Sequence, residues 1–250
     1  MFRVKICGVT TAVDSLTAAD AGADAIGLNF VSGSPRCLDV TQARAVAAVL
    51  PPGVLKVGVF AGMPAVDILR IAREVPLDAI QLHGHLDGDD DASDPPDRCR
   101  ELLSMPLIRA VRLDAGPAGD DRLAGARTWI EAARTLGHGP SMVIVDASVM
   151  PATEPGRLGG RGETVDWQAV AAARPLDLPM AIAGGLTPAN VAEAIARSGL
   201  RAVDTASGVE ASPGRKDPEK VRAFVSAALA ALAALNPPPE SNYQKARTQL

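Results

Sequence analysis

The sequence predicts a single-domain (β/α)8 barrel, also called a TIM barrel, in the α/β class. Short apolar runs alternate with helical patterns along nearly the whole chain of 250 residues, and there are eight such runs. Strands that alternate with helices pair in parallel through crossover connections, and eight such units typically take about 250 residues. The alternative is an open, doubly wound sheet, which we rank lower because no Gly-x-Gly-x-x-Gly follows the first apolar run.

The expected strands are short and rich in aliphatic residues. They cover residues 3–7, 25–30, 55–60, 79–83, 107–111, 142–147, 180–183 and 202–205. The expected helices between and after them include residues 40–50, 64–74, 121–136, 188–198 and 218–235. The helix after the seventh strand is expected to begin at Thr187-Pro188, because a hydroxyl can cap a helix and proline suits its first turn.

Composition limits the kinds of partner. The hydrophobic fraction is 47% but aromatic residues make up only 3%, so small aliphatic side chains must fill the core. The formal net charge of −4 argues against a nucleic-acid surface and against an anchor for anionic lipid. An anionic ligand would therefore need a local cluster of hydrogen-bond donors.

The cysteines and the N-terminus predict a cytoplasmic protein. Cys7, Cys37 and Cys99 are odd in number and widely spaced, so they suggest neither a disulfide framework nor a zinc site. The N-terminus lacks the apolar core of a signal peptide, and no apolar run is long enough to span a bilayer.

Two stretches fall outside the repeating pattern. Residues 87–97 read DGDDDASDPPD and are expected to form a solvated acidic insertion, since the spacing of a calcium loop is missing. Residues 236–250 are polar and rich in proline at their start, and are expected to be a disordered tail. The barrel domain is therefore expected to span residues 1–235.

The first expected strand ends in a cysteine. Lys5 and Cys7 point to the same side of a strand, and a nearby cation raises the fraction of reactive thiolate. A free cysteine is also commonly a small buried hydrophobe, and Lys5 could instead be paired with a carboxylate inside the barrel. In a (β/α)8 barrel the chemistry lies at the C-terminal strand ends, which favours a functional Cys7.

Other polar residues lie at the same strand ends. His83 ends the fourth expected strand, Arg109 lies in the fifth, and Asp146 closes the sixth. A buried carboxyl with a raised pKa would suit a general acid, although Asp146 could also cap a helix or pair with a cation. His83 is either a ligand contact or a core histidine. Arg36, in the loop after the second strand, is either a clamp for a carboxylate or a surface charge.

Glycines follow the last two strands. Gly184-Gly185 and Ser207-Gly208 lie where barrels of this kind often hold phosphate, and glycine lets a ligand approach backbone N–H groups closely. The alternative is that these glycines only turn the chain. The glycine-rich run at 159–162 could be a lid or a plain flexible connection.

Together these motifs resemble phosphoribosylanthranilate isomerase of tryptophan biosynthesis. The resemblance covers residues 3 to about 225 and comprises KICGVT at 5–10, GADAIGLNF at 22–30, SPR at 34–36, VGVF at 57–60, QLHG at 81–84, GGRGETVDW at 159–167, AGGLTPANV at 183–191 and VDTASGVEASPGRKD at 203–217.

The resemblance implies an Amadori rearrangement of N-(5-phosphoribosyl)anthranilate to 1-(2-carboxyphenylamino)-1-deoxyribulose 5-phosphate. By that resemblance Cys7 is the general base and Asp146 the general acid, and neither a metal nor an organic cofactor is required. Arg36 would bind the anthranilate carboxylate, and Gly184, Gly185, Ser207 and Gly208 would hold the phosphate. Lys5 and His83 are expected to contribute to substrate binding.

Several points remain open in the sequence. Where the glycine-rich loop of the family usually reads GGTG followed by a lysine and, after one residue, a phenylalanine, this chain has Arg161, Glu163 and Val165 in place of the threonine, lysine and phenylalanine. A histidine-pathway aminoaldose isomerase is a second reading, but similar proteins of that kind use two aspartates and here the first strand carries Cys7. A non-catalytic phosphosugar-binding barrel is a third reading.

Monomer and homodimer are both compatible with the sequence.

Overall fold

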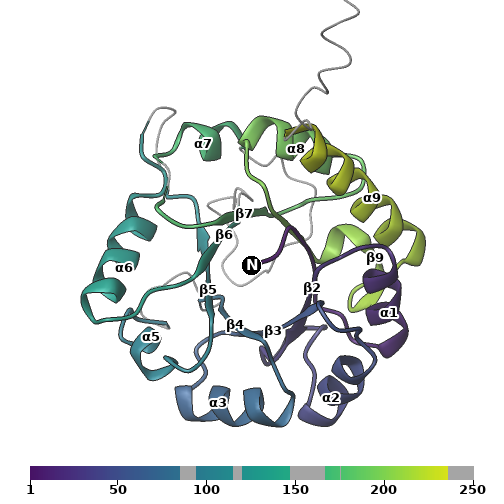
Figure 1. Ribbon diagram of the computed structural model, residues 1–250, viewed down its shortest axis with the longest axis horizontal. Coiled ribbons are helices and arrows are strands. Elements are labelled where there is room, and N and C mark those ends of the chain that lie inside the picture. The colour runs from purple at the N-terminus through teal and green to yellow at the C-terminus, as the bar shows by residue number, and fades with distance from the viewer. Residues whose placement is uncertain (85–93, 115–119, 147–166, 175, 236–250) are drawn as a thin grey trace, which may run out of the picture.

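The eight predicted strands form one closed parallel barrel. The computed structural model describes residues 1–84, 94–114, 120–146, 167–174 and 176–235, and within them β1 to β8 follow each other in order around the barrel (Figure 1). The strands are β1 (Val4–Cys7), β2 (Ala25–Asn29), β3 (Leu55–Phe60), β4 (Ala79–Leu82), β5 (Leu107–Arg112), β6 (Met142–Asp146), β7 (Met180–Ala183) and β8 (Val203–Thr205). Each expected strand is confirmed to within one residue at either end.

The helices form a ring outside the barrel (Figure 1). They are α1 (Ala12–Asp20), α2 (Val40–Ala48), α3 (Ala65–Glu74), α5 (Arg98–Glu101), α6 (Ala124–Thr135), α7 (Trp167–Ala172), α8 (Val191–Ser198) and α9 (Pro218–Leu235). The expected C-terminal helix is confirmed at both ends. Within the described ranges, every helix is too short or too polar to cross a bilayer.

The start of α8 differs from the prediction at Thr187-Pro188. The Asn190 side chain accepts a hydrogen bond from the Thr187 backbone N–H at 2.7 Å and donates to the Gly185 carbonyl oxygen at 3.0 Å. These two bonds hold residues 187–190 in a turn, so the helix begins only at Val191. The turn places Gly185 beside the helix start.

The core has two layers, which follow from the alternation of side chains along each strand. Inward residues, such as Ala25, Ala79 and Ile144, fill the barrel with small aliphatic side chains. Outward residues, such as Ile6 and Ile80, pack against the helices. Both faces of the strands are therefore apolar along most of their length, as is usual for parallel sheets.

The acidic insertion differs from the prediction in one respect. Asp94 is fully buried rather than solvated, because its carboxylate accepts a hydrogen bond from the Gly84 N–H at 3.0 Å and lies 3.6 Å from the Arg109 guanidinium. The rest of the insertion before this residue, the glycine-rich run at 159–162 and the tail at 236–250 lie outside the described residues.

A short segment after β8 was not predicted. It consists of the 3₁₀ turn η1 (Ser207–Val209) and an antiparallel hairpin of β9 (Glu210–Ser212) and β10 (Arg215–Lys216). The Thr10 hydroxyl donates to the Gly214 carbonyl oxygen at 2.6 Å, which ties the hairpin to the loop after β1. The hairpin thus joins the end of the barrel to its beginning.

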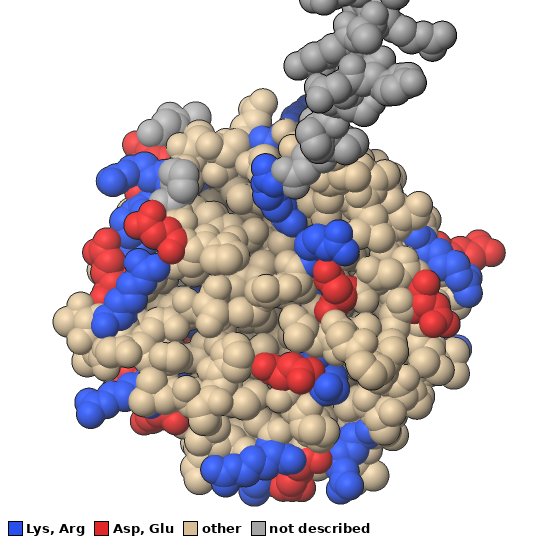
Figure 2. Space-filling view, in the orientation of Figure 1, with Lys and Arg blue, Asp and Glu red and all other residues tan. Residues whose placement is uncertain are grey.

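Charge is spread over the surface rather than concentrated. On the face shown in Figure 2, lysine and arginine side chains are interspersed with aspartate and glutamate. With a net charge of −4 for the chain, this face offers no broad basic patch for a polyanion.

Candidate active site

Cys7 lies at the C-terminal end of β1 on the inner side of the barrel, as expected. Its side chain is partly exposed. It lies against Gly27 of β2, where an added Cβ would come within 2.7 Å of the Cys7 sulfur. The absence of a side chain at Gly27 therefore leaves the space that the Cys7 thiol occupies. In the sequence, a glycine inside an otherwise aliphatic strand indicates such a close approach.

Lys5 lies one inward position below Cys7 and is fully buried. Its ammonium group donates to the Asp204 carboxylate of β8 at 3.0 Å. Burial alone would lower the pKa of Lys5, but the negative charges of Asp204 and of a Cys7 thiolate outweigh it, and the pKa is raised. Burial raises the pKa of Asp204 despite its lysine partner. The pairing of Lys5 with a carboxylate inside the barrel is therefore present, and the Lys5 charge also interacts with Cys7.

The Lys5–Asp204 pair yields a prediction for stability. In Asp204→Asn the ammonium group stays buried without a counter-ion, and we expect the free energy of unfolding to fall by about 3–5 kcal/mol in urea titrations at pH 7. The double variant Lys5→Met/Asp204→Leu removes both charges and is expected to recover most of that loss.

The matched control is the exposed pair of Glu193 and Arg197, whose atoms lie 2.7 Å apart on α8. Glu193→Gln is expected to change the free energy of unfolding by less than about 1 kcal/mol. If Asp204→Asn and Glu193→Gln lowered the free energy of unfolding by the same amount, Lys5 and Asp204 could not form a buried ion pair inside the barrel.

His83 follows β4 and is partly buried near the mouth of the barrel. Burial lowers its pKa, and the positive charges of Lys5 and Arg112 add to this, while Asp146 and Asp204 oppose it. Its Nδ1 lies 3.3 Å from the amide nitrogen of Gln81. A neutral imidazole accepts this bond at Nδ1 and carries its proton on Nε2.

The lowered pKa of His83 predicts acid sensitivity. Below about pH 6.5 the unfolded chain binds a proton at this position that the folded chain does not, so stability falls as the pH drops through that value. We expect the native protein to lose up to about 1 kcal/mol more than His83→Gln between pH 7 and pH 5.5, measured by urea unfolding at both pH values. If the free energy of unfolding fell equally in the native protein and in His83→Gln, His83 could not be neutral in the folded protein.

Asp146 ends β6 and is paired in register with Arg112 of β5 and Ala183 of β7. It shares its side of the strand with Ile144 and Met142, which fill the barrel interior, so its carboxylate faces the mouth of the barrel. The effect of its charge on His83 places the two side chains in one electrostatic neighbourhood.

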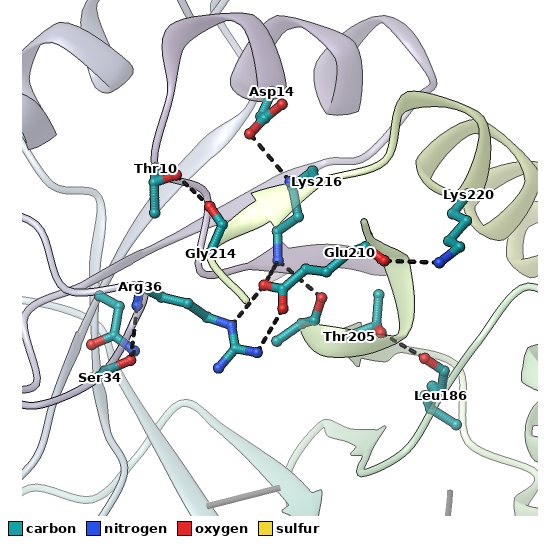
Figure 3. Close-up of polar contacts among 12 residues, drawn as sticks. Thr10, Asp14, Ser34, Arg36, Leu186, Thr205, Glu210, Gly214, Lys216 and Lys220 are labelled. Atoms are coloured by element: carbon teal, nitrogen blue, oxygen red, sulfur yellow. Dashed lines mark hydrogen bonds and ion pairs between the residues drawn. The ribbon is translucent and has the colours of Figure 1, made fainter. Parts of the chain in front are cut away.

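Arg36 is held by a carboxylate of the C-terminal hairpin (Figure 3). Its Nε and Nη2 atoms each donate to one oxygen of Glu210 at 2.7 Å. Glu210 also accepts from the Lys216 ammonium group at 2.9 Å, and Lys216 is almost fully buried. Burial would raise the pKa of Glu210, but the hydrogen bond from Arg36 and the charge of Lys216 lower it.

Glycine is required after β7 by the backbone conformation and after β8 by a close contact. Gly184 and Gly185 have φ of +91° and +60°, which only glycine adopts readily. A Cβ on Gly208 would collide with the Leu186 carbonyl oxygen, which also accepts a bond from the Thr205 hydroxyl at 2.7 Å. The loops after β7 and β8 are therefore packed directly on each other, next to the predicted Ser207.

Arg109 of β5 differs from the sequence interpretation, and Arg112 of the same strand was not considered in it. Arg109 does not reach the mouth of the barrel, because it points outward and stacks on the ring of Trp129 of α6 at 4.7 Å. Arg112, three residues later, is a cation whose charge, like that of Lys5, acts on His83. Sequence reasoning missed Arg112 and also Glu210 and Lys216, although the latter two belong to the quoted motif VEASPGRKD.

The described side chains suit an anion rather than a metal ion. Lys5, Arg36 and Lys216 all interact electrostatically with Cys7. In the part of the chain that the structure describes, no three histidine, cysteine, aspartate or glutamate side chains are grouped to hold a metal ion. A thiol and a carboxyl face one opening surrounded by cations and glycine-rich loops, an arrangement that can transfer protons on an anionic ligand.

Comparison with known proteins gives a consistent result. The family model described as N-(5'phosphoribosyl)anthranilate (PRA) isomerase matches residues 4–227. An N-(5'-phosphoribosyl)anthranilate isomerase of Neisseria gonorrhoeae is 42% identical over 226 residues, which is 90% of this chain and 96% of that protein.

Solved structures agree with the sequence comparison. Phosphoribosyl anthranilate isomerase from Thermotoga maritima matches with a TM-score of 0.74 and 33% identity, covering 92% of this chain and 100% of that one. A second structure of such an isomerase, in complex with reduced 1-(o-carboxyphenylamino)-1-deoxyribulose 5-phosphate, matches with a TM-score of 0.69 and 31% identity over 92% and 100% of the two chains.

Proposed function

Because the chain belongs to the N-(5'-phosphoribosyl)anthranilate isomerase family, we propose that it catalyses that isomerisation with Cys7 as general base and Asp146 as general acid. The isomerase activity, in tryptophan biosynthesis, follows from family membership over most of the chain. The assignment of the two proton-transfer residues rests on one observation: a thiol and a carboxylate end β1 and β6 on the inner side of the same barrel mouth.

The proposed reaction has two proton-transfer stages. Asp146 protonates the furanose ring oxygen, the bond from that oxygen to C1 breaks, and the nitrogen lone pair forms an iminium at C1. Cys7, as the thiolate, then removes the proton from C2, and the electron pair of that bond moves toward the iminium to give an enolamine. The C2 hydroxyl proton is lost and C1 gains a proton, which gives the ketone. The iminium is the electron sink, so this sequence of steps uses no metal or organic cofactor.

The surroundings of Cys7 support its role as the base. Lys5, Arg36 and Lys216 are cations whose charges interact with it, and the thiolate is the reactive form of cysteine. Lys5 is fully buried, so we assign its contribution to Cys7 and Asp204 rather than to direct contact with the substrate.

The remaining residues are proposed to bind the substrate. Arg36 donates to the anthranilate carboxylate, because the edge of its guanidinium that does not face Glu210 still carries N–H donors. The backbone of Gly184, Gly185, Ser207 and Gly208 holds the phosphate, since glycines follow two neighbouring strands there and let a ligand approach backbone N–H groups closely. Neutral His83 is proposed to contact the sugar.

The decrease of substrate fluorescence on addition of purified protein tests the function directly, and rescue of a tryptophan auxotroph blocked at this step tests it in a cell. Tight binding of the reduced product analogue without turnover would instead favour a non-catalytic phosphosugar-binding barrel. Offering the bis-phosphate substrate of the histidine-pathway isomerase in competition tests the second enzymatic reading, for which Cys7 in place of an aspartate is unfavourable.

A further inference from the structure

We propose that Glu210 is a positioning residue that fixes which edge of the Arg36 guanidinium faces the substrate carboxylate. This inference rests on the proposed role of Arg36. It concerns the hairpin after β8, which lies outside the eight strands and contains neither of the proposed proton-transfer residues.

The geometry of the pair assigns the two edges of the guanidinium. Glu210 takes one N–H from Nε and one from Nη2, each at 2.7 Å, so the side edge of the guanidinium is fully used. A guanidinium carries five N–H groups, and those that remain are the second on Nη2 and both on Nη1. In Figure 3 the third nitrogen of Arg36 points away from Glu210. This end edge has the spacing to bind a second carboxylate with two parallel hydrogen bonds.

Glu210 is itself held from several directions. Its side chain is only 5% exposed. The Lys216 ammonium group donates both to a Glu210 carboxylate oxygen and to the Ala206 carbonyl oxygen at 2.9 Å. The Lys220 ammonium group donates to the Glu210 backbone carbonyl oxygen at 2.8 Å. These contacts hold the Glu210 carboxylate in place, and its two hydrogen bonds hold the Arg36 guanidinium in turn.

The stem of Arg36 is fixed at the other end. A Cβ on Gly8 would collide with the Arg36 side chain, so the stem lies directly over the residue that follows Cys7. Arg36 and Cys7 attract each other electrostatically. Among the described residues, Glu210 is the one whose side chain accepts from the Arg36 guanidinium, so without it the N–H groups would no longer face the ligand in one orientation.

The charges in this cluster allow position to be separated from electrostatics. Arg36, Lys216 and Glu210 together carry two positive charges and one negative charge. The single variant Glu210→Gln adds a net positive charge, which by itself would attract a carboxylate more strongly. The double variant Glu210→Gln/Lys216→Met leaves Arg36 as the single cation, so the net charge is that of the native cluster while the carboxylate that holds the guanidinium is gone. It also avoids a buried Lys216 without its carboxylate partner.

The test uses two probes that differ in one group. The first is reduced 1-(o-carboxyphenylamino)-1-deoxyribulose 5-phosphate, and the second is the same compound made from aniline, which lacks the carboxylate. Calorimetric titration is carried out on the native protein, the single variant and the double variant, with circular dichroism as the check of folding. We expect the double variant to bind the carboxylate probe about 10-fold more weakly and the second probe less than about 2-fold more weakly.

Two controls make the result specific. Arg215→Met removes an exposed cation from the same hairpin and is expected to move neither affinity by more than about 2-fold. Arg36→Met tests the underlying assignment: if it does not reduce the preference for the carboxylate probe, the proposed role of Arg36 is wrong. If Arg36→Met reduces that preference and the double variant does not, only the role of Glu210 is wrong. Equal losses on both probes in the double variant would also overturn the inference, because a merely structural hairpin would act in that way.

Discussion

Replacement of Cys7 by alanine is expected to lower kcat by at least ~10²-fold, the usual scale for loss of a general base. The C2 proton of the ring-opened sugar then has no acceptor at the end of β1, while Arg36 and the glycine-rich loops after β7 and β8 keep their places. Affinity for the reduced product analogue should therefore change little. The measurement is the fluorescence assay under substrate saturation, together with a calorimetric titration of the analogue.

A second cysteine supplies the control for Cys7→Ala. Cys37 is exposed in the loop after β2, and Cys37→Ala is expected to keep turnover near the native value. Cys7→Ser tests the chemistry further: it keeps a small polar side chain against Gly27, but a hydroxyl ionises far less readily than a thiol. Turnover near the native value in Cys7→Ala would remove Cys7 from the mechanism.

Asp146→Asn is expected to show a loss of similar size, at least ~10²-fold in kcat. The amide has the shape of the carboxyl group but does not transfer a proton to the ring oxygen, so ring opening should become the slow stage. Because the two residues act in successive steps of one reaction, the double variant Cys7→Ala/Asp146→Asn should lose far less than the product of the single losses.

A matched control for the acid lies on the other side of the molecule. Asp20 ends α1 and is exposed, at the end of that helix away from the loop that follows β1. Asp20→Asn removes the same charge from the chain and is expected to leave kcat unchanged. An Asp146→Asn variant as active as this control would show that the carboxyl of Asp146 is not the acid.

The architecture was predictable because it depends on local patterns. Eight apolar runs and the helices between them follow from hydrophobic periodicity, and the strand ends mark the side of the barrel on which Cys7, His83 and Asp146 lie. The common direction of Lys5 and Cys7 followed from strand alternation alone.

The direction of Arg109 could not be predicted from the same alternation. In a parallel barrel both faces of a strand are apolar, so the pattern indicates which residues share a face but not which face is inside. The neighbours Ile108 and Ala110 prove to be the inward residues, and Arg109 therefore points toward α6. The burial of Asp94 could not be predicted either. The acidic composition around it indicated a solvated loop, whereas its carboxylate accepts a hydrogen bond from the Gly84 N–H inside the protein.

The contact between Arg36 and Glu210 could not be predicted from the sequence for another reason. The two residues are 174 positions apart, and each lies in a loop or hairpin whose local sequence carries no sign of the other. Their charges were visible in the motifs, but only the closed barrel brings the loop after β2 next to the segment after β8.

The pairing of β1 with β8 also has a consequence for how the protein folds. Lys5 and Asp204 are separated by 199 residues, and Thr10 and Gly214 by 204, so the polar contacts around Cys7 join the two ends of the barrel sequence. Closing such long loops is slow, because the chain loses conformational entropy before the stabilising contacts form. Residues 1–200 alone would already contain Cys7, Arg36, His83 and Asp146, yet they would lack Glu210, which holds Arg36, and Asp204, which pairs with Lys5 next to Cys7. Competence for ligand binding should therefore arise last during synthesis, when the chain through Lys216 has left the ribosome and the final strand closes the ring.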